Sequence, residues 1–143
     1  MSEAENRRAI DRFVQELNAG NVGVMDELFA DDTVVAYPQS GEVIRGKANL
    51  VSIYAVAAGL PKIAPYRTTS AGEIVVTEAI LDYGGGDTYN TIFVFEFRGG
   101  KIARHTSYWS KPFPAPEWRA PWVTIEPRGK KAARNVGRPR PRK

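Results

Sequence analysis

The spacing of apolar residues over the first sixty positions predicts three helices. The first follows the capping-box pattern Ser2-x-x-Glu5, ends at 18–20, and repeats its apolar residues at helical intervals: Ile10, Phe13, Val14 and Leu17. A second, short helix is predicted over 23–30. Asp31 and Asp32 then interrupt the pattern, and 33–37 is typical of a strand that Pro38 ends. A third helix is predicted over 47–58, and one of its faces is apolar: Leu50, Ile53, Tyr54 and Ala57.

From about residue 66 onward the period of the pattern changes from helical to two. Segments near 66–70, 73–83, 88–97 and 101–110 are rich in Val, Ile, Thr, Tyr and Phe, and glycine-containing turns separate them. Helices followed by a run of hairpin-connected strands indicate an α+β fold and not an alternating βαβ one.

The predicted strand 88–97 has two apolar faces. Its odd positions include Phe93, Phe95 and Phe97, and its even positions include Ile92 and Val94. Antiparallel sheets often leave one face to solvent, so a second apolar face needs a cover. Two alternatives could cover this face. One is a partner subunit in a homodimer, and the other is the segment 112–125, which could fold back over the sheet or over a cavity mouth.

Composition excludes several classes of site. With 143 residues and 43% apolar residues, the chain can fill one sizeable core. It contains no Cys and one His, which excludes disulfide scaffolds, Cys-ligated zinc, iron–sulfur clusters, thiol catalysis and the His clusters of most catalytic zinc sites. We therefore expect no metal site, and the functions considered below imply no cofactor.

The formal net charge of +4 divides unevenly along the chain. Residues 128–143 hold eight cations and no acid, whereas residues 1–127 hold 12 Lys and Arg against 16 Asp and Glu. We predict a folded domain over 1–127, which includes the Pro- and Trp-containing segment 112–127, and a disordered basic tail over 128–143. Such a tail would bind nucleic acid only weakly and non-specifically.

No apolar run approaches the roughly 20 residues that span a bilayer. The first residues also lack the apolar core of a secretory signal. We expect a cytoplasmic protein with no membrane partner.

Several short motifs, in their order and spacing, resemble the NTF2-like superfamily, and most closely its SnoaL-like and ketosteroid-isomerase-like branch. The resemblance covers about residues 4–111 and rests on these runs: Phe13-x-x-x-Leu17-Asn18-Ala19-Gly20-Asn21, Leu28-Phe29-Ala30-Asp31-Asp32, Ile44-Arg45-Gly46-Lys47, Gly100-Lys101-Ile102 and Tyr108-Trp109. It implies a cone-shaped fold in which three N-terminal helices pack on a strongly curved antiparallel sheet, with an apolar cavity at the open end, usually in a homodimer. Members include ketosteroid isomerases, polyketide cyclases, epoxide hydrolases and dehydratases, and others only bind ligands or partners.

The family's catalytic residues do not carry over as complete sets. Tyr37 stands where ketosteroid isomerases have their base, Phe13 and a position at or near Phe93 stand where they have their two oxyanion donors, and only the supporting Tyr54 remains. Polyketide cyclases of the SnoaL type have a His and an acid in the last strand. Here His105 matches, but the place of the acid holds Ser107.

Strand alternation and these alignments together predict which side chains face the cavity. The predicted ligand contacts are Phe13, Tyr54, Thr77, Phe93, Phe95, Ser107 and Trp109. Glu78 and Asp82 have the opposite parity and are placed on the outer face. The candidate catalytic residues are His105, whose ordinary pKa near 6.5 suits general acid–base chemistry, and Tyr37, which could donate a hydrogen bond to a developing oxyanion.

Two functions follow as expectations. The first is a cofactor-independent enzyme that isomerises, cyclises, dehydrates or hydrates an apolar, carbonyl-containing metabolite. The alternative is a non-catalytic module that binds a small apolar or aromatic ligand, or a partner. The depleted catalytic sets favour the alternative, and the pairing of His105 with Tyr37 favours the enzyme.

Overall fold

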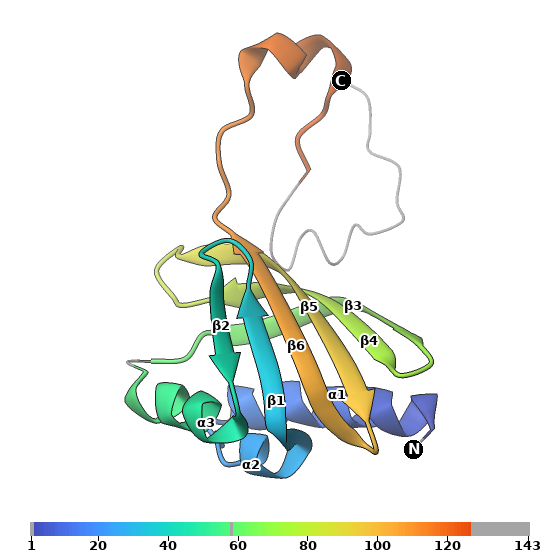
Figure 1. The fold of residues 1–143 in the computed structure, drawn as a ribbon. Helices are drawn as coiled ribbons and strands as arrows, with labels where there is room; N and C mark the ends of the chain where they lie inside the picture. The colour runs from blue at the N-terminus through green and yellow to red at the C-terminus, as the bar shows by residue number, and fades with distance from the viewer. Residues whose placement is uncertain (1, 58, 127–143) are drawn as a thin grey trace.

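A computed structural model describes residues 2–57 and 59–126, and the tail predicted over 128–143 lies outside them. A six-stranded sheet curves around a long N-terminal helix, and two shorter helices lie beside the first strands (Figure 1). The elements follow in this order: α1 (Glu3–Asn18), α2 (Val24–Leu28), β1 (Phe29–Tyr37), β2 (Glu42–Arg45), α3 (Lys47–Val56), β3 (Lys62–Ala71), β4 (Ile74–Asp82), β5 (Thr88–Arg98), β6 (Lys101–Ser110) and the 3₁₀ helix η1 (Glu117–Trp122). The α+β fold expected from the sequence is confirmed.

The capping residue predicted from the sequence starts helix α1. The Ser2 hydroxyl accepts a hydrogen bond from the Glu5 backbone N–H at 3.1 Å, which satisfies one of the free donors of the first turn. At the other end, the Asn18 side chain donates to the Ile63 carbonyl at 2.8 Å and accepts from the Ile63 N–H at 2.7 Å. The Asn18 amide therefore makes the two backbone hydrogen bonds that a neighbouring strand would make with Ile63, and it connects the end of α1 to β3.

The sheet has the order β2-β1-β6-β5-β4-β3. All neighbouring strands are antiparallel except β1 and β6, which run parallel, so the sheet is mixed where the sequence predicted an antiparallel one. The hairpin-linked strands β3 to β6 form the antiparallel part. The parallel pair arises because β1 comes before the helix α3 and joins the far edge of that meander.

Strand β1 is longer than predicted and the second helix shorter. The structure ends α2 at Leu28 and begins β1 at Phe29, so Asp31 and Asp32 lie within a strand. The register of β1 against β6 shifts between Phe29 and Val34, and this irregularity accommodates the acidic pair at the surface. The third helix also ends early, at Val56.

The short strand β2 was not predicted. Only Ile44 of its four residues is buried, so the segment carries no alternation that a sequence pattern could reveal. The turn that follows needs Gly46, whose φ of 89° favours glycine and whose N–H donates to the Thr33 carbonyl at 2.8 Å.

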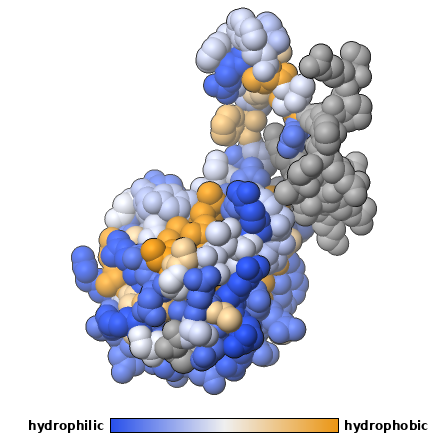
Figure 2. Space-filling model, turned by 90° about the vertical axis from the view of Figure 1, so that its right-hand side faces the viewer, coloured by the Kyte–Doolittle hydropathy of each residue, from blue (hydrophilic) through white to orange (hydrophobic). Residues whose placement is uncertain are grey.

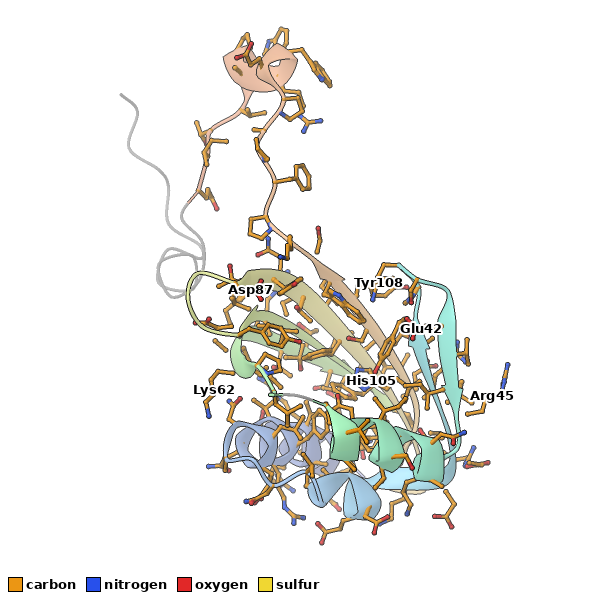
Figure 3. All side chains as sticks on the ribbon, turned by 90° about the vertical axis from the view of Figure 1, so that its left-hand side faces the viewer. Glu42, Arg45, Lys62, Asp87, His105 and Tyr108 are labelled. Atoms are coloured by element: carbon orange, nitrogen blue, oxygen red, sulfur yellow. The ribbon has the colours of Figure 1, made fainter. Side chains whose placement is uncertain are left out.

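The segment 112–125 does not fold back over the body. Residues 112–126 rise from the end of β6 and stand away from the sheet (Figures 1 and 3). Proline at positions 112, 114 and 116 fixes φ at every second residue, which keeps the start of this segment extended. Of the two covers expected for the second apolar face, folding back is therefore wrong for this structure.

The core lies between α1 and the concave face of the sheet. Its largest fully buried side chains include Phe13, Phe29, Phe95, Ile10 and Met25. Glu78 and Asp82 lie outside this core, as predicted: the Glu78 carboxylate pairs with Arg67, and Asp82 Oδ1 accepts from the Gly84 N–H. No helix among residues 2–57 and 59–126 is long and apolar enough to cross a membrane.

Candidate functional site

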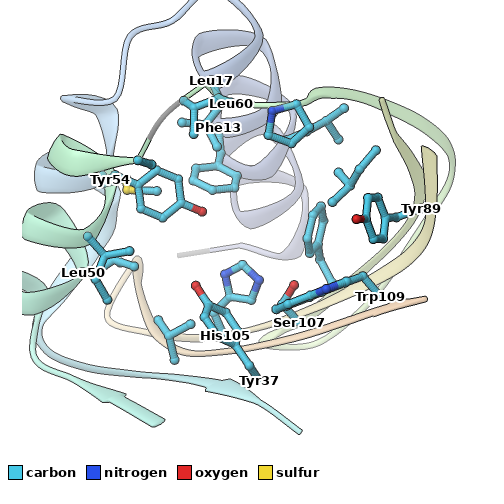
Figure 4. A pocket seen from close by; sticks show the side chains of 18 of the residues that line it. Phe13, Leu17, Tyr37, Leu50, Tyr54, Leu60, Tyr89, His105, Ser107 and Trp109 are labelled. Atoms are coloured by element: carbon cyan, nitrogen blue, oxygen red, sulfur yellow. The ribbon is translucent and has the colours of Figure 1, made fainter. Parts of the chain in front are cut away.

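A cavity of about 290 Å³ lies between α1, α3 and the concave face of the sheet (Figure 4). Helices α1 and α3 supply one wall, strands β1, β5 and β6 supply the opposite wall, and the 57–63 connection supplies part of the rim. None of the described residues that line the cavity is Asp, Glu, Lys or Arg. The cavity surface is therefore uncharged as long as His105 is neutral.

Four phenylalanines surround the single histidine. We call Phe13, Phe29, Phe93 and Phe95 the phenylalanine cluster. The ring centroid of His105 lies 4.4 Å from that of Phe95, 5.4 Å from Phe93, 6.2 Å from Phe29 and 6.4 Å from Phe13. Strand alternation explains this packing, because Phe93, Phe95 and His105 all point to the concave face and Phe95 is the direct cross-strand partner of His105.

The phenylalanine cluster changes the acid–base character of His105. The residue is only 6% exposed, and burial lowers the pKa of its imidazole to about 3. Its Nε2 atom is sealed from solvent and has no hydrogen-bond partner among the described residues. The imidazole is therefore neutral at physiological pH, which corrects the expectation of an ordinary pKa near 6.5.

Hydroxyl-bearing and indole side chains line the more exposed part of the cavity. We call Tyr37, Tyr54, Tyr83, Tyr89 and Trp109 the tyrosine rim. The Tyr37 and Trp109 rings pack edge to face with centroids 5.0 Å apart, and those of Tyr83 and Tyr89 pack similarly at 5.6 Å. The tyrosine rim is more exposed than the phenylalanine cluster, and Tyr83 is 51% exposed.

Burial raises the pKa of Tyr54 strongly and that of Tyr37 to a lesser extent, because the phenolate form would lose its hydration in the cavity. Both side chains remain protonated at neutral pH and can donate hydrogen bonds. In Figure 4 the Tyr54 hydroxyl and the His105 ring point into the same space from opposite walls. A molecule between them can meet a hydrogen-bond donor on one side and a neutral imidazole on the other.

Most residues predicted as contacts line this cavity. The structure brings together Phe13, Tyr37, Tyr54, Phe93, His105, Ser107 and Trp109. Thr77 and Phe95 do not line it. Thr77 is 1% exposed and its hydroxyl lies 3.4 Å from that of Thr68, whereas Phe95 is fully buried behind His105. Alternation gave their face correctly, and their direct cross-strand partners Phe93 and His105 do line the cavity, but the Thr77 and Phe95 side chains are buried and do not reach its surface.

Sequence reasoning missed part of the rim. Tyr83 and Tyr89 flank the 84–87 turn, and Leu60 and Pro61 follow α3. Tyr89 shares its parity with Phe93 and could have been found by extending the alternation toward the turn. Tyr83, Leu60 and Pro61 lie outside any regular element, so no periodic signal marks them.

The comparisons with known proteins agree with this geometry. Residues 10–105 match the family described as SnoaL-like domain. An NTF2-like protein of unknown function from Burkholderia xenovorans is similar, with 35% identity and a TM-score of 0.76 over 86% of this chain and 96% of that one. No curated protein matches the sequence.

Two further solved structures share the fold at lower identity. A candidate ketosteroid isomerase from Kribbella flavida is similar at 20% identity and a TM-score of 0.81, over 90% of this chain and 94% of that one. An epoxide hydrolase from Mycobacterium tuberculosis, of the limonene-epoxide-hydrolase-like type, is similar at 22% identity and a TM-score of 0.66, over 76% of this chain and 84% of that one. At these identities the likeness concerns the fold alone.

Proposed function

Because the chain belongs to the family of SnoaL-like domains, we propose that its cavity binds an uncharged, largely apolar molecule carrying a carbonyl group. We further propose that the protein is a cofactor-independent acid–base enzyme, of the kind that isomerises, cyclises, dehydrates or hydrates such a molecule. The observation that carries the proposal is a neutral imidazole in the wall of an aromatic cavity without charged side chains.

The uncharged ligand follows from the cost of desolvation. A carboxylate or ammonium group that entered this cavity would lose its hydration and would find no opposite charge among the described lining residues. The aromatic side chains can instead pack against a flat, apolar molecule and bury its surface. Tyr37, Tyr54 and Ser107 supply the few polar contacts that would fix its orientation.

In the proposed reaction His105 acts as a base. A ligand cannot reach the sealed Nε2, so among the ring nitrogens the proton acceptor is Nδ1. Nε2 then carries the ring proton and points it at the surrounding aromatic rings, an arrangement that aromatic faces tolerate. A group with a pKa of about 3 is unprotonated at neutral pH, so all molecules are ready to accept a proton but none can start as the acid.

In this proposal Tyr37 takes the complementary role. Nδ1 of His105 takes a proton from a carbon next to the carbonyl, the C–H electron pair moves into the new C=C bond, and negative charge develops on oxygen. The Tyr37 hydroxyl, protonated because of its raised pKa, donates a hydrogen bond to that oxygen. The buried imidazolium then returns its proton to the molecule at another atom, which completes an isomerisation or cyclisation without a cofactor.

A non-catalytic binding module is the second candidate. It is favoured by the isolation of His105: no described carboxylate or backbone group orients the imidazole, and no anion is placed to stabilise its protonated form. In that case the same cavity selects the same uncharged ligands but leaves them unchanged.

The test uses matched pairs of aromatic ketones, in which one member of each pair carries an added carboxylate. Thermal-shift binding to the full chain should favour the uncharged members, and equal or stronger binding of the carboxylates would contradict the uncharged site. Each bound ketone is then incubated in D₂O, and deuterium at the carbon next to the carbonyl is followed by NMR. An enzyme exchanges the proton, and His105→Gln stops the exchange whereas Tyr108→Phe, on the outer face, does not. Binding without exchange would establish the binding module.

A further inference from the structure

Residues 112–126, which we call the arm, expose large apolar side chains. Phe113 is 66% exposed, Trp118 is 70% exposed and Trp122 is 79% exposed. Of the hydrogen bonds and ion pairs among the described residues, none joins the arm to the body. Figure 2 shows orange, hydrophobic residues on this projecting part of the molecule. Three exposed aromatic rings on one short segment are unfavourable in water. A group of this kind marks a contact surface.

The arm has a shape of its own although it touches little of the body. Its turn η1 contains a hydrogen bond from the Arg119 N–H to the Pro116 carbonyl at 3.3 Å, and the Arg119 guanidinium lies 5.2 Å from the centre of the Trp118 ring. At its root, Lys111 Nζ lies 3.4 Å from Asp87 Oδ1. The prolines between root and turn keep η1 away from its own sheet, so another molecule must supply the surface that Trp118 and Trp122 lack.

The outer face of the sheet carries the second uncovered surface. Cross-strand pairing places one mainly apolar row, which includes Thr106 and the 8% exposed Ala36, across five strands, and a neighbouring pair extends it toward the root of the arm. We call these residues the outer band: Val43, Ala36, Thr106, Val94, Val76, Tyr108 and Ile92. Val43 is 47%, Tyr108 46% and Ile92 42% exposed, and an orange patch is visible on the body in Figure 2.

Most of the charges that flank the outer band on the central strands are paired. On one side Arg104 lies 3.7 Å from Glu96, and on the other side the Glu78 carboxylate pairs with Arg67. At the edge of the band, Arg45 of β2 shares the face of Val43 and makes no ion pair with the described residues. The band is therefore suited to an apolar partner and not to a strongly charged one.

We propose that the arm of one copy packs on the outer band of a second copy, and that the two copies exchange arms around a twofold axis. Both surfaces belong to the same chain, so a symmetric pair covers both arms and both bands, whereas a single copy covers neither. One Phe and two Trp side chains bury roughly 150–250 Å² each when fully covered, and 66–79% of each is exposed in a single copy. Two arms and the bands that receive them can therefore bury about 1,300–2,200 Å². That area suffices for a stable dimer, which needs about 1,200–2,000 Å².

The absence of Cys from the chain allows a direct test. Ala120→Cys places a single thiol on the arm beside the aromatic residues, and Thr106→Cys places one in the outer band. The two single-Cys variants of the full chain are mixed, equilibrated and treated with a short thiol-to-thiol crosslinker. Arm exchange predicts an abundant covalent pair joining one chain of each kind, identified by mass spectrometry.

The matched control replaces Thr106→Cys by Val56→Cys. Val56 is 83% exposed, belongs to α3 and is not part of the outer band. Sedimentation velocity in parallel should give a dimer for the unmodified chain and at least a tenfold weaker one for the double variant Trp118→Ser, Trp122→Ser. Equal crosslinking to Val56→Cys, a monomeric unmodified chain, or a double variant that dimerises unchanged would each overturn the proposal. A crosslink within one chain of an Ala120→Cys, Thr106→Cys variant would overturn it too, because the arm would then cover its own sheet.

Discussion

The phenylalanine cluster and the tyrosine rim are both aromatic, yet they do different things to the groups beside them. The cluster packs with ring centroids 5.6 and 5.7 Å from Phe13 and holds His105 in a space without polar partners. The rim keeps hydroxyl groups and an indole at the more exposed part of the cavity, where Tyr83 is half exposed. The cluster therefore determines the protonation state of the imidazole, and the rim determines which polar and aromatic groups a bound molecule can contact.

This difference shows how one fold separates stability from recognition over a few ångströms. Phe95 does not line the cavity but lies directly behind His105 and is fully buried. Tyr54 and Tyr37 lie in the cavity wall and are only partly buried as whole residues. Truncation of Phe95 should then act on folding, and changes in the rim should act on binding.

The largest expected effect separates the two regions by stability. Phe95→Ala removes a fully buried ring and leaves a void that the strands cannot close, so we expect a loss of about 3–5 kcal/mol in the free energy of unfolding. Tyr83→Ala, at the half-exposed rim, should cost well under half of that. Urea unfolding of both variants measures the contrast, and equal losses would show that the rim is part of the folding core.

Much of the architecture could be predicted because it depends on local patterns. The apolar spacing of Ile10, Phe13 and Leu17 predicted α1 and the face that it buries. Glycine-containing turns marked the connections between β3, β4, β5 and β6, and alternation put Phe93 and His105 on the concave face. These features follow from the periods of helix and strand, which a sequence shows directly.

What the sequence could not show depends on how side chains pack and on contacts between elements. Alternation cannot tell that Phe95 and Thr77 are buried away from the cavity surface whereas Phe93 lies in its wall. The parallel pairing of β1 with β6 joins segments about 70 residues apart, which no local pattern reports. The low pKa of His105 follows from four phenylalanines on three different elements, so it appeared only with the packed structure.

The second expected effect uses pH to test the cluster. The pKa of His105 is about 3 when folded against about 6.5 when unfolded, so below pH 6.5 the unfolded chain binds more protons. Stability should therefore fall as the pH falls, by about 2 kcal/mol from this group between pH 7 and pH 5. Urea unfolding at both pH values measures the loss.

The matched variant for this measurement is His105→Phe, which keeps an aromatic ring in the cluster and cannot be protonated. Between pH 7 and pH 5 the free energy of unfolding of His105→Phe should fall by about 2 kcal/mol less than that of the unmodified chain. The carboxylates that titrate at lower pH are common to both proteins and cancel in this comparison. An unchanged pH dependence in His105→Phe would mean that the cluster does not disfavour the charged imidazole.

The smallest expected effect concerns the rim. Tyr54→Phe removes one hydroxyl from the cavity wall, so an uncharged ketone that accepts a hydrogen bond there should bind about fivefold more weakly, by about 1 kcal/mol. Stability in urea should change little. Tyr66→Phe, on β3 outside the cavity, is the control and should leave binding unchanged. Equal effects of the two variants would remove Tyr54 from the binding surface.

The state of His105 can be read most directly by NMR, because the chain contains one histidine and its ring signals need no assignment among others. A titration of the ¹⁵N-labelled ring from pH 8 to pH 4 should show a neutral imidazole throughout, with the proton on Nε2 and no midpoint in that range. A midpoint near pH 6.5, or a proton on Nδ1, would contradict a buried neutral base that faces the cavity.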